Sequence, residues 1–301
     1  MVVQPAARAA AGGENGGMVN IARGVASTNG IRLHYLAAGD GPLIVLLHGW
    51  PQTSHCWRHI LPVLAETHTV LAPDLRGYGL SDKPTSGYDK RTMAADIAGL
   101  VTELGFSSAS VVGHDRGARV AHRWALDRPD QVARLVLLDI IPTREMWLRM
   151  DADLARRCFH WLFHLQPDLP ERLAGADIAG YLTYFFHHWT RNRHAFDPDT
   201  LAHYIQAFST PGTLRASLDD YRAADLDTEH DNASYGTRLP MPLLVLWGST
   251  SFLEHLPALE IWHSYATNPQ GHPINNCGHF IPEEQPDVLL QHLKEFFGSS
   301  T

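Results

Sequence analysis

The chain is poor in cysteine. Its 301 residues include only three, Cys56, Cys158 and Cys277, at widely separated positions. An odd number of distant cysteines does not fit a disulfide framework, whereas free buried thiols suit a reducing compartment. The sequence therefore predicts a cytoplasmic protein whose fold does not depend on disulfides.

Basic residues are in the minority. The chain has 24 Lys and Arg against 32 Asp and Glu, and so a net charge of −8. No basic face is indicated, so we expect neither nucleic acid nor an anionic membrane as a partner. The sequence also lacks an apolar run of bilayer-spanning length and an apolar segment of the kind found in secretory signals.

Recognisable cofactor motifs are missing as well. No glycine-rich nucleotide fingerprint follows the first predicted strands. Among the 19 histidines, His187 and His188 are adjacent. Neighbouring residues on a helix point about 100° apart, and no Cys or carboxylate stands at ligand spacing from this pair. We therefore expect no metal and no cofactor.

Short apolar runs alternate with helical segments along most of the chain. Strands are predicted at residues 43–47, 69–74, 111–112, 133–138, 241–248 and 273–274, and helices at residues 118–127 and 286–297. This alternation is typical of a parallel sheet that is covered by helices on both faces.

One long stretch breaks this alternation and sets the predicted domain boundaries. Residues 143–239 have aromatic and histidine side chains at helical spacing and no good strand, which predicts a helical cap over an active site. The α/β core is predicted to comprise residues 25–142 and 240–301. Residues 1–24, rich in Ala and Gly, are predicted to be a flexible tail.

A strand and tight turn at residues 111–117 carry Asp115 between Gly113 and Gly117. The pattern small-x-nucleophile-x-small is typical of a nucleophile elbow, which exposes one side chain at a strand-to-helix turn. A carboxylate attacks amides and esters poorly, but it can displace a leaving group from an sp³ carbon and form an ester that water then cleaves. The chemistry indicated is carbon–halogen or epoxide opening. The alternative is that Asp115 only caps the helix that begins near Gly117.

An aspartyl nucleophile needs a base to activate water, and the base needs an orienting acid. His279 follows the last predicted strand, as the chain order nucleophile, acid, histidine requires. After the strand ending at Gly248 no carboxylate occurs until Glu254, so Asp139, directly after the preceding strand, is the predicted acid. The alternatives are that His279 is a surface residue and that Asp139 only terminates a strand.

These motifs together resemble the fluoroacetate (haloacetate) dehalogenases of the α/β-hydrolase superfamily. The resemblance runs from about residue 28 to about residue 297, and it departs from the family pattern at Trp50 and Met146. Epoxide hydrolases and haloalkane dehalogenases share the elbow but usually have Trp at the position of Arg116. The motifs that carry the resemblance are residues 48–53, 113–119, 138–139, 159–161, 220–222 and 278–280.

The resemblance implies an α/β-hydrolase fold with a mostly parallel sheet, flanking helices and a helical cap. It implies a role for each matching residue, as follows: Asp115 as nucleophile, Asp139 as acid, His279 as base, Arg116 and Arg119 as ligands of the substrate carboxylate, His160, Trp161 and Tyr221 as halide-binding residues, Trp189 in the cap wall, and the backbone N–H groups of Trp50 and Arg116 as the oxyanion hole. Relatives commonly form homodimers, so a homodimer is expected.

The predicted function is cofactor-free hydrolysis of a small anionic haloacid, most simply haloacetate, to glycolate and halide, with water as second substrate. Without the resemblance, the alternatives are that Arg119 is a helix-surface residue and that residues 159–161 belong to the cap core. An epoxide hydrolase is the main alternative, because Tyr181, Tyr184, Tyr204 or Tyr221 could protonate an oxirane oxygen. A ligand-binding protein that keeps the fold without turnover is the alternative from another class.

Overall fold

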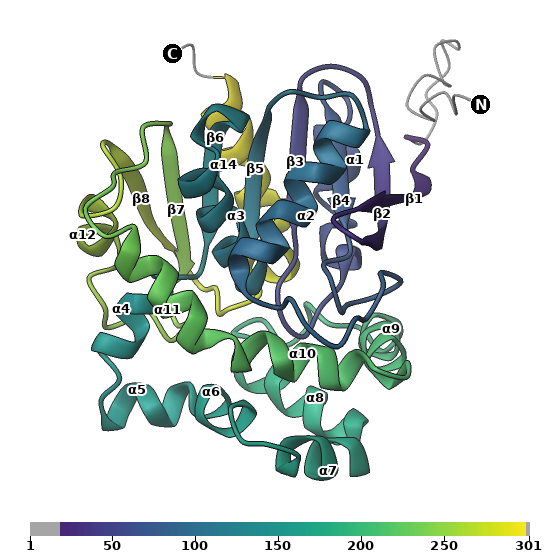
Figure 1. The fold of residues 1–301 in the computed structure, drawn as a ribbon, viewed down its shortest axis with the longest axis vertical. Coiled ribbons are helices and arrows are strands. Elements are labelled where there is room, and N and C mark those ends of the chain that lie inside the picture. The colour runs from purple at the N-terminus through teal and green to yellow at the C-terminus, as the bar shows by residue number, and fades with distance from the viewer. Residues whose placement is uncertain (1–18, 299–301) are drawn as a thin grey trace.

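A computed structural model describes residues 19–298 of the chain as a sheet with helices on both faces and a layer of helices across one end (Figure 1). Of the predicted tail, residues 1–18 lie outside the described residues. The tail prediction is wrong for residues 22–24, because the first strand begins at Ala22.

The eight strands form a single sheet in the order β1-β2-β4-β3-β5-β6-β7-β8. β1 and β2, and β2 and β4, pair antiparallel, and the remaining neighbours pair in parallel. The strands are β1 (Ala22–Thr28), β2 (Ile31–Ala38), β3 (Leu43–Leu47), β4 (Thr69–Pro73), β5 (Ala109–His114), β6 (Val132–Leu138), β7 (Leu243–Gly248) and β8 (Pro269–Ile274).

All six predicted strands end within two residues of the carboxyl end of an observed strand. β3 and β5 are buried along almost their whole length, because helices cover both faces of a parallel sheet. The hairpin of β1 and β2 was not predicted. β1 is largely solvent-exposed and has no apolar run, so periodicity gave little signal there.

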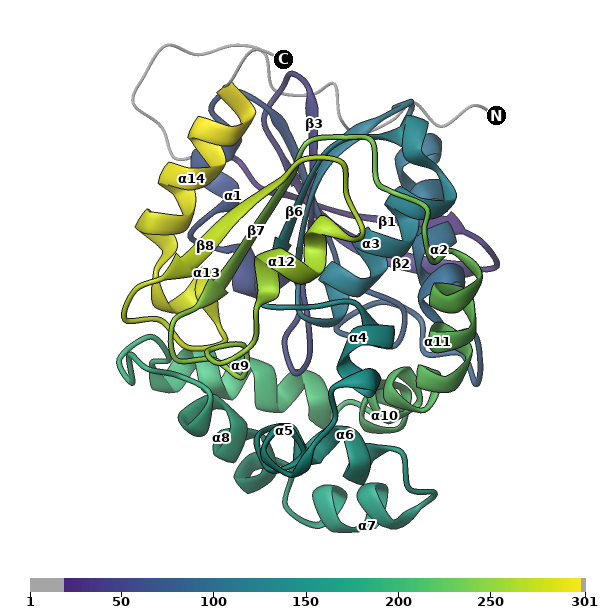
Figure 2. The same cartoon turned by 90° about the vertical axis from the view of Figure 1, so that its left-hand side faces the viewer.

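Helices pack on both faces of the sheet: α2 and α3 on one, α1 and α14 on the other (Figure 2). α3 begins at Arg116, two residues before the predicted start and directly after Asp115. The core helices are α1 (Leu61–Leu64), α2 (Lys90–Glu103), α3 (Arg116–Asp127), α12 (Ala258–His263), α13 (Ile281–Glu284) and α14 (Pro286–Gly298), with short 3₁₀ turns at η2 (Ser54–Trp57) and η3 (Pro129–Gln131).

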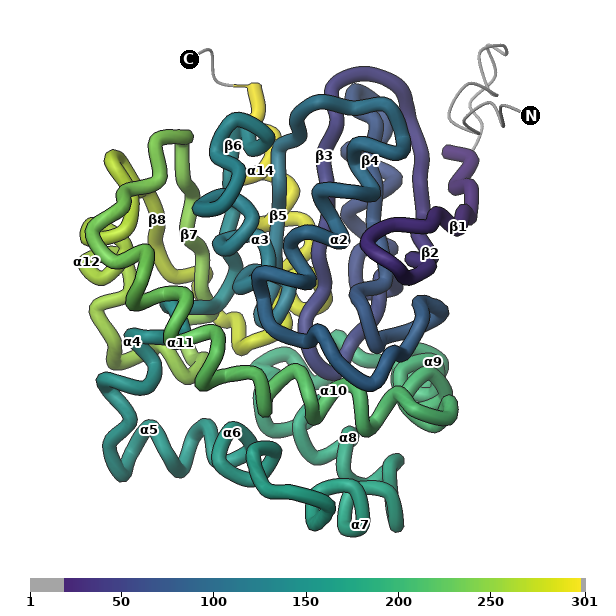
Figure 3. The backbone as a smooth tube through the Cα atoms, viewed as in Figure 1, coloured from purple at the N-terminus to yellow at the C-terminus, as the bar shows by residue number. Residues whose placement is uncertain are grey.

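The chain leaves the sheet after β6, forms eight helices in succession and returns at β7 (Figure 3). All eight lie within the predicted cap, residues 143–239. They are α4 (Thr143–Leu148), α5 (Ala152–Arg157), α6 (Phe159–His164), α7 (Leu169–Ala176), α8 (Ile178–His188), α9 (Pro198–Ser209), α10 (Thr213–Arg222) and α11 (Ala224–Ala233). No helix within residues 19–298 is long and apolar enough to cross a membrane.

Candidate active site

Asp115 occupies the sharp turn between β5 and α3, with φ 49° and ψ −117°, a conformation that non-glycine residues adopt rarely. The two glycines of the motif allow this turn to pack closely. A Cβ on Gly113 would lie 2.5 Å from Ala118 Cα, and one on Gly117 would lie 2.3 Å from the His48 carbonyl oxygen. The sequence therefore needs glycine on both sides to present the carboxylate.

The side chain of Asp115 makes no capping hydrogen bond to α3, so the helix-cap alternative is wrong. Its Oδ1 instead accepts a hydrogen bond from the backbone N–H of Trp50 at 2.8 Å. Trp50 follows β3, the strand beside β5 in the sheet. The predicted oxyanion donor thus contacts the carboxylate of the predicted nucleophile, as its predicted role requires.

Asp139 and His279 are hydrogen-bonded, with 2.6 Å between Asp139 Oδ2 and His279 Nδ1. Asp139 directly follows β6 at φ 54°, and its Oδ1 accepts the Gly248 N–H at 3.0 Å. These two hydrogen bonds orient the carboxylate toward the histidine loop. Glu254, the later carboxylate considered in the sequence, is partly exposed and lies near Arg157.

His279 is buried, and its Nε2 lies 3.8 Å from Asp115 Oδ2. Burial lowers the pKa of His279, but the hydrogen bond and charge of Asp139, and then the charge of Asp115, outweigh burial and raise that pKa above its ordinary value. This distance between Nε2 and Oδ2 is too long for a hydrogen bond. It suits a base that acts on a water approaching the carboxylate carbon.

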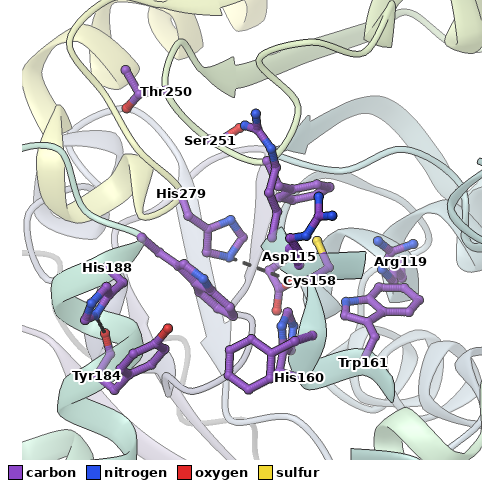
Figure 4. A pocket seen from close by; sticks show the side chains of 15 residues that line it. Asp115, Arg119, Cys158, His160, Trp161, Tyr184, His188, Thr250, Ser251 and His279 are labelled. Atoms are coloured by element: carbon purple, nitrogen blue, oxygen red, sulfur yellow. Dashed lines mark hydrogen bonds and ion pairs between the residues drawn. The ribbon is translucent and has the colours of Figure 1, made fainter. Parts of the chain in front are cut away.

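A cavity of about 280 Å³ opens between the core and the cap above Asp115 (Figure 4). Asp115 and His279 line it from the core, and His160, Trp161 and Trp189 line it from the cap. In Figure 4, Arg119 and Trp161 lie together on one side of Asp115, whereas Tyr184 and His188 lie on the other. Three arginines, including Arg156 and Arg157 of α5, face the cavity against a single carboxylate.

The family model described as alpha/beta hydrolase fold matches residues 42–286, which span the elbow, the acid, the cap and the histidine. The chain belongs to the α/β-hydrolase family. The predicted fold class is therefore confirmed, and the enzyme is placed among hydrolases without its substrate being fixed.

Relatives of this α/β hydrolase carry two different activities in their names. The chain is 40% identical to a soluble epoxide hydrolase of Corynebacterium sp. (strain C12), over 90% of this chain and 96% of the relative. It is 37% identical to a fluoroacetate dehalogenase of Burkholderia sp., over 90% and 91%. A crystal structure of a Nostoc sp. PCC 7120 protein, classed as an alpha/beta hydrolase, superposes with a TM-score of 0.90 at 42% identity, over 93% of this chain and 99% of that one.

Arg119 of the hydrolase is buried and lines the cavity, one helical turn after Asp115. One guanidinium nitrogen donates to the Ile141 carbonyl and to Thr143 Oγ1, while Nε has no hydrogen-bond partner in the described part of the chain. Burial, and then the charge of Arg116, lower the pKa of Arg119 to about 10, so the side chain is still cationic at neutral pH. Within residues 19–298 it has no carboxylate at ion-pair distance.

Arg116, the other predicted ligand of the substrate carboxylate, is already paired within the protein. Its guanidinium is 1% exposed and forms an ion pair with Asp220 of α10 at 2.6 Å, and it also donates to the Asp220 carbonyl. Lys90 and Tyr78 contact the same carboxylate. Burial lowers the pKa of Arg116, but Asp220 outweighs burial and raises it. Since the protein itself supplies this carboxylate, a contact of the Arg116 side chain with substrate stays a prediction.

His160, Trp161 and Tyr221, predicted to bind halide, are brought together by α6 and α10. The Tyr221 ring lies 5.5 Å from the ring of His160 and 5.9 Å from that of Trp161, centroid to centroid. His160 Nδ1 and the Tyr221 hydroxyl are buried without a hydrogen-bond partner among residues 19–298. Burial lowers the pKa of His160 and raises that of Tyr221, so both are uncharged donors near neutral pH.

The four cap tyrosines considered for oxirane protonation separate into two pairs. Tyr204 donates to Glu283 at 2.5 Å, and the Tyr181 hydroxyl lies 2.6 Å from His164 Nε2. Tyr184 lines the cavity and is 44% exposed, whereas Tyr221 is buried near Asp115, whose charge adds to burial in raising its pKa. Of the four, Tyr184 is the one that lines the cavity, and Tyr221 is the one whose hydroxyl is buried without a hydrogen-bond partner among residues 19–298.

Two residues that hold the histidine loop were not predicted. The backbone carbonyl of His279 is 2.8 Å from Nε2 of His114, the residue before the nucleophile, and Glu284 accepts hydrogen bonds from Gly278 and Phe280. The motif Gly278-His279 marks the loop but does not indicate its partners, because these contacts join backbone atoms to side chains far apart in the chain. No group of three or more candidate metal ligands occurs within residues 19–298.

Proposed function

We propose that this α/β hydrolase is a hydrolytic dehalogenase of small 2-haloacids, with haloacetates as its substrates. The observation that carries this proposal is the guanidinium of Arg119, a buried cation that faces the cavity beside the nucleophile and lacks a carboxylate partner. A buried charge without a counterion is costly. A substrate carboxylate supplies that counterion. Arg156 also lines the cavity and favours approach of an anion, whereas Arg157 is paired with Asp153.

The reaction begins with in-line attack of Asp115 Oδ2 on the carbon that bears the halogen. The new C–O bond forms as the C–X bond breaks, and the bonding pair departs with the halide. His160, Trp161 and Tyr221 supply neutral donors to the leaving halide. The product of this first step is a glycolyl ester of Asp115.

Water then hydrolyses the ester. His279 accepts a proton from water, and the resulting hydroxide adds to the carboxyl carbon of Asp115, where the backbone N–H groups of Trp50 and Arg116 stabilise the oxyanion. Collapse breaks the bond between this carbon and the glycolate oxygen, which takes a proton. Overall, haloacetate and water give glycolate, halide and one proton.

The pH dependence of turnover should reveal the loss of charge on Asp115. The Asp115 carboxylate helps to raise the pKa of His279, and this contribution disappears when the carboxylate becomes an ester. Because His279 must be neutral to act as base, kcat limited by ester hydrolysis should rise with pH through a lower pKa than that of His279 in the free enzyme. An NMR titration of His279 beside the kcat profile checks this. If kcat rose with pH through a pKa higher than the one that NMR gives for His279 in the free enzyme, the prediction would be wrong.

Trp161→Phe tests the halide site. The substitution keeps most of the apolar ring beside Arg119 and removes the indole N–H. Loss of one transition-state donor costs roughly 2.7–4 kcal/mol in comparable sites. Fluoride is the poorest leaving group and concentrates its charge most, so kcat should fall most for fluoroacetate, less for chloroacetate and least for bromoacetate. Equal losses on all three, with circular dichroism unchanged, would assign Trp161 to cap packing.

Epoxide hydrolysis is the second candidate function. The unpartnered Tyr221 hydroxyl favours it, because a buried phenol close to Asp115 can protonate an opening oxirane. The names of relatives support both activities. The discriminating experiment measures halide release from fluoro-, chloro- and bromoacetate beside diol formation from styrene oxide. The proposal requires halide release to dominate, and diol formation without halide release would replace it with the second candidate.

A non-catalytic binding protein would give neither halide nor diol in the same assay. The predicted cytoplasmic location, the homodimer, and the absence of nucleic-acid and membrane partners stay predictions.

A further inference from the structure

One buried carboxylate connects the loop that carries His279 to the cap. Glu284, at the end of α13, is 4% exposed. Its Oε1 accepts N–H groups of Gly278 and Phe280, both at 3.1 Å, on either side of His279. Its Oε2 accepts N–H groups of Arg191 and Asn192 at 2.7 and 3.0 Å, in the loop that follows α8 of the cap. Four backbone donors from two segments thus converge on a single side chain.

The two segments also touch directly. The backbone N–H of His279 donates to the carbonyl of Trp189 at 2.8 Å, and the indole of Trp189 lines the cavity. A Cβ on Gly278 would lie 2.1 Å from the Trp189 carbonyl oxygen and 2.9 Å from Glu284 Oε1. Glycine at position 278 is therefore required for this approach. The position of His279 and that of the cap wall are fixed by the same few contacts.

We propose that Glu284 is a positioning residue that couples the cap segment 189–192 to His279 and so sets the geometry of ester hydrolysis. The first chemical step, attack by Asp115, does not use His279. Loss of Glu284 should therefore slow the second step selectively. The inference rests on the proposed ester pathway, but not on the identity of the leaving group.

Glu283 provides a matched control on the neighbouring position. It is equally buried, at 5% exposed, and belongs to the same short helix. Its carboxylate faces another set of groups: Arg58 at 2.6 Å, Tyr204 at 2.5 Å and Gln52 at 3.1 Å. Glu283→Gln removes a buried carboxylate without touching the donors of the histidine loop. Any effect specific to Glu284→Gln is then due to those donors.

The experiment follows single turnovers of chloroacetate by wild type, Glu284→Gln and Glu283→Gln, at a pH where kcat no longer changes. The chloride burst reports attack by Asp115, and intact-protein mass spectra report decay of the ester. Displacement of a catalytic group by about 1 Å costs roughly a hundredfold in rate. We expect ester decay in Glu284→Gln to be slower by about tenfold or more, with the chloride burst within about threefold of wild type. Glu283→Gln should change neither step by more than about threefold.

Only folded enzyme forms the ester, so its decay rate is independent of any unfolded fraction. Glu284→Asp keeps the charge but withdraws the carboxylate by one methylene, and it should also slow ester decay. It replaces Glu284→Gln if that variant does not fold. Unchanged ester decay in the Glu284 variants, or equal slowing of both steps, would overturn the inference.

Amide hydrogen exchange tests the coupling without substrate. In Glu284→Gln, segments 189–192 and 278–280 should both exchange faster than in Glu283→Gln, and faster exchange in only one of them would overturn the coupling. If wild type releases no halide, the proposed function fails, but the hydrogen-exchange experiment still tests the coupling through Glu284. If the enzyme turns over styrene oxide instead, the decay of the ester that Asp115 forms with styrene oxide is measured in place of the decay of the glycolyl ester.

Discussion

His279→Asn should become covalently modified by haloacetate and stay modified. Attack by Asp115 on the halogenated carbon does not need the base, whereas hydrolysis of the ester does. The variant should therefore release about one equivalent of halide and stop. Intact-protein mass spectra should show a stable adduct, and peptide mapping should place it on Asp115.

Asp115→Asn is the control for this experiment, because it removes the attacking carboxylate and leaves the Asp139–His279 pair in place. It should form no adduct and release no halide. A His279→Asn protein that releases a full equivalent of halide while remaining unmodified would rule out the proposed order of steps.

Arg119→Gln should lose activity on haloacids and keep most of it on neutral analogues. Truncating one partner of a buried charge pair typically costs 2–5 kcal/mol. Because about 1.4 kcal/mol corresponds to tenfold, kcat/KM for chloroacetate should fall by about 30-fold or more. Turnover of chloroacetamide, which has no negative charge for Arg119 to bind, should fall far less. Steady-state kinetics on the acid and the amide measure the difference.

Arg123→Gln is the matched control for Arg119→Gln. Arg123 is also a buried arginine of α3, but it pairs with Asp127 and does not line the cavity. Its loss should affect acid and amide equally. Arg116→Gln should also affect acid and amide equally if its guanidinium serves mainly to hold Asp220. If Arg119→Gln lowered kcat/KM equally for chloroacetate and chloroacetamide, the argument for an anionic substrate would fail.

The local sequence was sufficient to predict the parts of the fold that depend on burial pattern and chain order. β3 and β7 are almost entirely apolar, and β5 and β6 each contain a shorter apolar run. Asp115, Asp139 and His279 each follow a strand, and the carboxyl ends of parallel strands meet at one edge of a sheet. Their approach to one another was therefore predictable without any structure.

Contacts that depend on the cap docking onto the core were not predictable in this way. Nothing near Arg116 in the sequence indicates that Asp220, a hundred residues later, would occupy its guanidinium. Glu284 was not predicted as a site residue, yet it accepts N–H groups from two distant loops. Every residue except proline has a backbone N–H, so the type of residue does not indicate which N–H groups join such a network.

The central claim is that Asp115 itself bonds to the substrate carbon, and one isotope measurement tests it most directly. Wild-type enzyme in excess over chloroacetate is allowed a single turnover in water enriched in ¹⁸O. If Asp115 attacks carbon, the glycolate hydroxyl comes from the carboxylate, so the glycolate should be unlabelled and the peptide containing Asp115 should gain ¹⁸O. Labelled glycolate with an unlabelled Asp115 peptide would show that water attacks carbon directly and would contradict the account.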